Sequence, residues 1–109
     1  MNISYHSRIR KKFGSSADIK RTFGTMAKKV QQRIDDIHAS PNLKVLMQLP
    51  AANAHPLSGN KSGEWALNIS PNHRMIFVID HSPIPRSDTG EIDTIMITDI
   101  IITETTDYH

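Results

Sequence analysis

The clearest structural signal in this chain of 109 residues is the stretch Glu64–Asp80, which reads EWALNISPNHRMIFVID. From Trp65 to Ile69 every second residue is large and apolar, and this period of two indicates a half-buried strand. The residues Ser70–His73 have the composition of a turn, and the run from Met75 to Asp80 returns as a second strand. The stretch therefore predicts a β-hairpin.

Upstream of the hairpin the apolar residues follow a helical period instead. Ser15 or Ser16 can cap a helix that begins there, and Gly24 predicts a break or bend in its middle. A shorter helix before it is predicted to end at Gly14. One apolar stripe, at spacings of 4, 3, 4, 4 and 3 residues, marks the buried face of the longer helix: Ile19, Phe23, Met26, Val30, Ile34 and Ile37.

Downstream of the hairpin the sequence predicts a loop and then more strand. His81–Gly90 contains two prolines and several small polar residues, which favour a loop. Ile92–Thr103 is rich in Ile and Thr and predicts one long strand, or two strands joined at a bulge near Asp99. Helices followed by an antiparallel sheet of about four or five strands make an α+β fold. We therefore expect residues 1–109 to form a single domain, with N-terminal helices packed on a small antiparallel β-sheet.

The composition excludes several classes of protein. The chain has no cysteine, which excludes a disulfide framework and thiolate zinc sites and fits a reducing cytoplasm. Its first residues lack an apolar segment, and no stretch approaches ~18 apolar residues, so we expect no secretion signal and no membrane span. The six histidines are scattered without metal-ligand spacing, so no metal site is expected.

Charge is distributed unevenly along the chain. Residues 1–50 carry ten Lys and Arg against three acidic residues, whereas residues 51–109 carry three against eight. A basic half of this size is a plausible footprint for a polyanion such as RNA. On charge alone, a solvated helix face explains it equally well.

Three groups of polar residues in the second half can carry chemistry. His55 precedes the polar loop Ser58–Gly63, whose two glycines allow close approach to a ligand, although a simple connecting loop has the same composition. Arg74 begins an apolar run, where a guanidinium serves either as a structural ion-pair partner or as a phosphate clamp. The titratable residues Asp107–His109 are either functional or a frayed end.

Three blocks of this sequence resemble HigB-type toxins of the RelE/ParE toxin superfamily. The first block is His55–Ile69, where the family pattern is H-P-L-x-G-(D/N)-(R/K)-x-G-x-W-S-I-x-(I/V). The second is His73–Phe77, against (W/Y)-R-I-x-F, and the third is Asp107–His109, against D-Y-H. The blocks occur in the family's order, and the helices of residues 1–54 are compatible with it.

The resemblance implies the toxin of a bacterial type II toxin–antitoxin system. Such a toxin is a cytoplasmic endoribonuclease, an mRNA interferase, which cleaves mRNA on the translating 70S ribosome and inhibits growth. It uses no metal or cofactor and does not associate with a membrane. Its implied partners are the ribosome, mRNA and a cognate helix-turn-helix antitoxin of the HigA type.

The resemblance also assigns roles to individual residues. His109 is implied as the main group for acid–base work and His55 as the second imidazole, with the roles of acid and base left open. Arg74 stabilises the transition state, Tyr108 positions the phosphate or stacks on a base, and Asp107 orients either His109 or Tyr108. Residues expected to bind RNA are Ser58, Asn60, Lys61, Arg8, Arg10, Lys11 and Lys12.

Two departures from the family pattern keep other interpretations open. Ser58 stands where close relatives often carry Lys, and Ser82–Glu91 looks like an insertion that either alters ribosome docking or has no effect. One alternative is a toxin of the same fold that poisons gyrase by protein binding without nuclease activity, although His109 argues against it. The others are an inactive paralogue and a plain nucleic-acid-binding domain.

Overall fold

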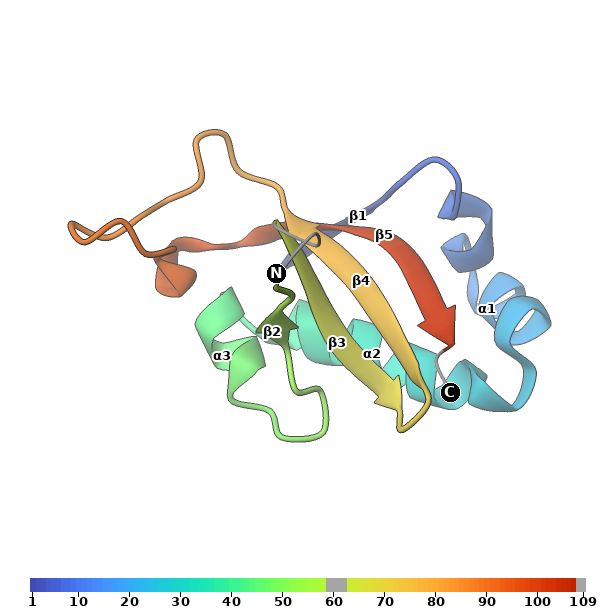
Figure 1. The fold of residues 1–109 in the computed structure, drawn as a ribbon. Helices are drawn as coiled ribbons and strands as arrows, with labels where there is room; N and C mark the ends of the chain where they lie inside the picture. The colour runs from blue at the N-terminus through green and yellow to red at the C-terminus, as the bar shows by residue number, and fades with distance from the viewer. Residues whose placement is uncertain (59–62, 108–109) are drawn as a thin grey trace.

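In the computed structural model, which describes residues 1–58 and 63–107, five strands form one mixed sheet in the order β1-β5-β4-β3-β2 (Figure 1). The predicted hairpin is confirmed, because β3 and β4 pair antiparallel with Trp65 opposite Phe77. β5 lies on the other side of β4 and also runs antiparallel to it. The strands are β1 (Asn2–Tyr5), β2 (His55–Pro56), β3 (Glu64–Ser70), β4 (His73–Ile79) and β5 (Asp99–Asp107).

The helices begin and end at residues whose chemistry explains their bounds. The Ser15 side chain caps α1 by accepting a hydrogen bond from the Asp18 amide, and Asn42 caps α3 in the same way. Gly24 has φ of +55°, which separates α1 from α2 and confirms the predicted break. The elements are η1 (Arg10–Phe13), α1 (Ser16–Phe23), η2 (Gly24–Met26), α2 (Ala27–Ala39), α3 (Leu43–Met47) and η4 (Thr94–Met96).

The core lies between α2 and the sheet. Figure 1 shows α2 crossing one face of the sheet, with α1 beside it. From α2 the residues Val30, Ile34 and Ile37 are buried, as the apolar stripe predicts. They belong to one cluster with side chains of the central strands, among them Trp65, Leu67, Met75, Phe77, Ile100 and Ile102. The α+β fold class is therefore confirmed.

The edge strand β1 is absent from the sequence prediction. It pairs parallel to β5, with Asn2 opposite Asp99 and Tyr5 opposite Ile102, so the sheet is not entirely antiparallel. Its alternation of Ile3 and Tyr5 with polar neighbours covers only four residues. A strand this short is recognisable only through its partner, because its alternation is too brief to stand out along the chain.

The prediction of a continuous strand from Ile92 is wrong. Ile92 forms only an isolated bridge with Arg86, a 3-10 turn follows at Thr94–Met96, and the strand begins at Asp99. The break in alternation near Asp99 marks this strand start, whereas the bulge lies between Ile76 and Phe77 of β4 and their partners in β5. The predicted loop His81–Gly90 is confirmed and extends away from the sheet in Figure 1.

Candidate functional site

No helix among the described residues covers the face of the sheet opposite α2 (Figure 1), and we call it the open face, although Ala66 and Ile76 on it are buried. The strand register defines which side chains it carries. Directly opposed residues of antiparallel strands project from the same face. One row across this face consists of His55, Ala66, Ile76 and Glu104, from β2, β3, β4 and β5. The adjacent row consists of Asn68, Arg74 and Thr106. The structure thus places His55 and Arg74 on one face, with their strands about 10 Å apart.

The surroundings of His55 determine which of its ring nitrogens carries the proton. Nδ1 lies 2.7 Å from the carbonyl oxygen of Asn53, which can only accept, so Nδ1 donates. Asn53 has φ of +46°, a left-handed conformation that asparagine tolerates better than most residues. In the neutral ring the lone pair is therefore on Nε2, which can accept a proton.

Two polar groups beside Arg74 were not identified from the sequence. Glu104 projects from the same face as Arg74, diagonally across from it on β5. The hydroxyl of Thr106, directly opposite Arg74, is buried and has no hydrogen-bond partner among the residues that the structure describes. Neither belongs to a sequence motif, and only the register brings them beside Arg74.

Asp107 projects from the other face of the sheet, opposite His73. Its Oδ2 lies 3.5 Å from Nε2 of His73, and Nδ1 of the same ring lies 3.0 Å from the hydroxyl of Ser70. The sequence prediction did not include His73, which stands where the family pattern has Trp or Tyr. Among the other predicted site residues, Asn60, Lys61, Tyr108 and His109 lie outside the described residues.

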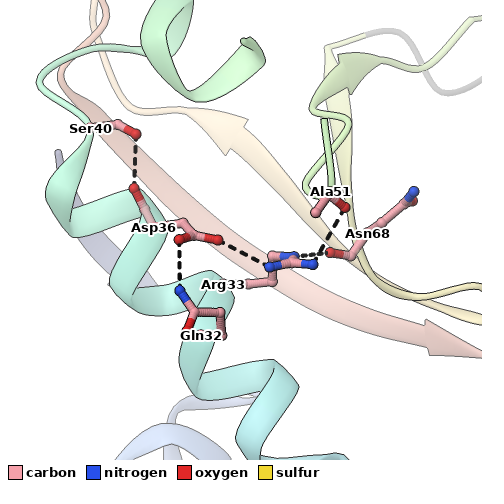
Figure 2. A network of polar contacts seen from close by, with 6 residues as sticks. All are labelled: Gln32, Arg33, Asp36, Ser40, Ala51 and Asn68. Carbon is pink, nitrogen blue, oxygen red and sulfur yellow. Dashed lines mark hydrogen bonds and ion pairs between the residues drawn. The ribbon is translucent and has the colours of Figure 1, made fainter. Parts of the chain in front are cut away.

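Arg33 braces the strand opposite Arg74, as Figure 2 shows. Its Nε donates to the carbonyl of Asn68 at 2.7 Å, and its Nη1 forms an ion pair with Asp36 at 3.1 Å. Asp36 in turn accepts from Gln32 through its side chain at 2.9 Å. Arg33, one of the basic residues in the first half of the chain, thus fixes α2 to β3 instead of extending into solvent. It does so at Asn68, the cross-strand partner of Arg74.

The remaining predicted RNA-binding residues divide into two groups. Arg10, Lys11 and Lys12 line an open cavity of about 630 Å³ together with Arg21 of α1. Arg8 instead donates from Nε to the Thr103 carbonyl at 3.1 Å, which fastens this segment along β5. Ser58 is exposed just after β2. The Arg21 and Ser15 side chains bond to Asp18 at the cavity's edge and hold its pKa below the ordinary value.

Two further classes of feature are not found in the described part of the chain. Within residues 1–58 and 63–107, no three His, Cys, Asp or Glu side chains lie close enough together to hold a metal ion. Among the same residues, no helix combines the length and the apolar character needed to cross a membrane.

Several solved structures with a similar fold are toxins or toxin–antitoxin complexes. The YoeB/ParE toxin from Agrobacterium tumefaciens superposes with a TM-score of 0.57 at 15% identity, over 100% of both chains. The YoeB-YefM complex from Staphylococcus aureus superposes with a TM-score of 0.56 at 16% identity, over 100% of this chain and 97% of that chain. YafQ from E. coli superposes with a TM-score of 0.55 at 16% identity, over 97% of this chain and 91% of that chain. This is the fold of the RelE/YoeB-like toxins.

The comparison of sequences adds no closer assignment. No protein-family model matches the chain, and no curated protein matches it. The likeness to solved toxins therefore establishes the fold, while the resemblance to the HigB type stays a prediction.

Proposed function

We propose that this protein is the toxin of a type II toxin–antitoxin system and cleaves mRNA on the ribosome, as HigB-type toxins do. The observation that carries the proposal is that His55 and Arg74 project from the same open face of a RelE/YoeB-like sheet. An imidazole with a free acceptor nitrogen and a guanidinium are the groups that transfer of a phosphodiester requires.

The proposed reaction needs no group from outside the protein and the RNA. Nε2 of His55 removes the proton from the 2′-OH of the nucleotide before the cut, and the 2′-oxygen attacks the adjacent phosphorus. The bond from phosphorus to the 5′-oxygen breaks, leaving a 2′,3′-cyclic phosphate and a free 5′-OH. Arg74 stabilises the negative charge that develops on the phosphate oxygens.

The other roles are proposed from the sequence resemblance. His109 protonates the leaving 5′-oxygen, Tyr108 positions the scissile phosphate, and Asp107 orients the residues that follow it. Asn60 and Lys61, with Ser58, meet the RNA beside the site. The hydrogen bond that holds His55 in its Nδ1–H form supports giving it the role of base and His109 the role of acid.

The basic cavity is proposed to dock the toxin on ribosomal RNA. Arg10, Lys11 and Lys12 face it together with Arg21, so a phosphate entering it meets four positive charges and one carboxylate, Asp18. Binding through such contacts weakens as salt is added, because counterions compete for the phosphates.

The proposed protein partner is a helix-turn-helix antitoxin of the HigA type. Binding is proposed to take place in the cytoplasm. Among the solved relatives, YoeB of S. aureus forms a heterotetrameric complex with YefM. An acidic segment of the antitoxin is proposed to contact the same basic helices, so that antitoxin and ribosome compete for the toxin.

The test is controlled induction of the wild type and of His109→Gln in growing cells. Protein and DNA synthesis are followed by pulse labelling, and the 5′ ends of transcripts are mapped. We expect the wild type to stop protein synthesis first and to produce new 5′-OH ends, whereas His109→Gln, which keeps hydrogen bonding but cannot titrate, does neither. Arrest of DNA synthesis before translation, without new RNA ends, would instead support the gyrase-poison alternative.

A further inference from the structure

The imidazole of His73 connects two segments that end at the same side of the sheet. His73 is the first residue of β4, Ser70 is the last residue of β3, and His73 lies opposite Asp107 in the register. Its Nδ1 lies 3.0 Å from the Ser70 hydroxyl and its Nε2 lies 3.5 Å from the Asp107 carboxylate. If Nε2 carries a proton toward Asp107, the Ser70 hydroxyl donates to Nδ1, so both contacts are consistent with one tautomer.

The Asp107 end of this connection immediately precedes, in the sequence, the residues proposed to position the phosphate and to protonate the leaving oxygen. Asp107 is the last residue of β5, and Tyr108 and His109 follow it in the sequence. A side-chain contact at Asp107 therefore restrains the residue that immediately precedes Tyr108 and His109 in the sequence.

We propose that His73 is a positioning residue for the cleavage reaction, an inference that rests on the function proposed above. It holds Asp107 against the end of β3 and so fixes the last described residue of β5, after which Tyr108 and His109 follow in the sequence. His73 itself projects from the face opposite Arg74 and does not touch the reacting phosphate. Its effect reaches the chemistry only through the placement of the groups that follow Asp107.

The chain offers a matched control in His81. This second imidazole lies just beyond the other end of β4, and its Nε2 accepts hydrogen bonds from the backbone amides of Thr98 at 3.0 Å and Asp99 at 3.2 Å. His81 thus fastens the start of β5 as His73 fastens its end. A substitution that removes either imidazole loosens the same strand, but only one of them lies beside Asp107.

The experiment measures single-turnover cleavage of mRNA on purified ribosomes, together with thermal unfolding. His73→Phe keeps a flat ring but removes both polar contacts, and His73→Gln keeps a donor and an acceptor. Because a displacement of ~1 Å can cost ~100-fold in rate, we expect His73→Phe to lower the saturating rate by at least about 10-fold. The toxin concentration that gives half the maximal rate should not change, and His73→Gln should restore most of the rate.

A double-mutant cycle decides whether His73 acts through Asp107. Adding His73→Phe to Asp107→Ala should lower the rate little further, because each substitution alone already removes the contact between the two side chains. His81→Phe should lower the melting temperature and leave the saturating rate unchanged. If His73→Phe does not fold, Ser70→Ala removes one of the two contacts and should still lower the rate.

The outcomes separate this inference from the proposed function. A wild-type protein that cuts no RNA overturns the proposed function and the role of His73 with it. A wild type that cuts, beside a His73→Phe variant with an undiminished rate, overturns the role of His73 alone. Independent, multiplicative effects of His73→Phe and Asp107→Ala, or an equal loss of rate in His81→Phe, also overturn it.

Discussion

Replacing Arg33 with methionine should destabilise the fold by about 3 kcal/mol. Methionine keeps most of the aliphatic stem, so the loss comes from the polar contacts of the guanidinium. The bond from Nε to the Asn68 carbonyl is short, 2.7 Å, and a hydrogen bond with a charged donor contributes roughly 2 kcal/mol. The ion pair with Asp36 joins side chains that are 14% and 21% exposed, and we assign it about 1 kcal/mol.

Urea denaturation, followed by tryptophan fluorescence, measures this loss directly. Trp65 is the single tryptophan of the chain and is 4% exposed, so its emission reports on the core. For a domain of this size, a loss of 3 kcal/mol corresponds to a melting temperature lower by about 12 °C. Arg33→Lys keeps the charge but not the planar fork of donors, so its melting temperature should lie between those of the wild type and Arg33→Met.

A neighbouring residue on the same helix serves as the control. Gln31 donates to Asp35 at 2.9 Å on the exposed side of α2, so Gln31→Met should change the stability by no more than about 0.5 kcal/mol. If Arg33→Met is as stable as Gln31→Met, Arg33 does not brace β3, and the contacts in Figure 2 contribute nothing measurable.

Three further predictions concern the core, the site and the acid stability. Ile34→Asp buries an unpaired charge under the sheet and should cost several kcal/mol; a cooperatively folded variant with an unchanged melting temperature would show that this stripe is not core. Arg74→Ala should lower cleavage by ~10²–10³ while ribosome and antitoxin binding persist, and an equal loss of folding and activity would make Arg74 structural. The lowered pKa of Asp18, caused mainly by its bond from Arg21, means that its ionised form stabilises the fold at neutral pH and that this contribution is lost as the pH falls through the lowered pKa. Asp18→Asn should therefore unfold at lower urea than the wild type at pH 7, and the difference should shrink as the pH is lowered in acid; a difference independent of pH would contradict this origin.

Periodicity is enough to predict the elements that bury one continuous face. The stripe from Ile19 to Ile37 and the alternation from Trp65 to Ile69 each repeat over several residues, so both α2 and the hairpin could be placed from the sequence. β1 and the start of β5 could not, because β1 has four residues and the Ile- and Thr-rich composition continues across the point where β5 begins.

The candidate site was predictable only where a motif carries it. His55 and Arg74 belong to the blocks that resemble the toxin family, and both lie on the open face. His73, Glu104 and Arg33 acquire their places from the register of β4 with its neighbours and from a bond that spans 35 residues of sequence. No local pattern encodes such contacts, because they depend on which strands become neighbours.

The position of β5 within the sheet has a consequence for when a newly synthesised chain can complete its fold. β5 lies between β1 and β4, and its pairing with β1 joins residues that are 97 positions apart, Asn2 and Asp99. The sheet therefore cannot close while residues 99–107 are still inside the ribosome that synthesises them. A nascent chain with β3 and β4 already exposed has only part of the surface that a substrate or an antitoxin would meet. Under the proposed function, neither the face that carries His55 and Arg74 nor a surface for a neutralising partner is therefore complete before β5 has left the ribosome.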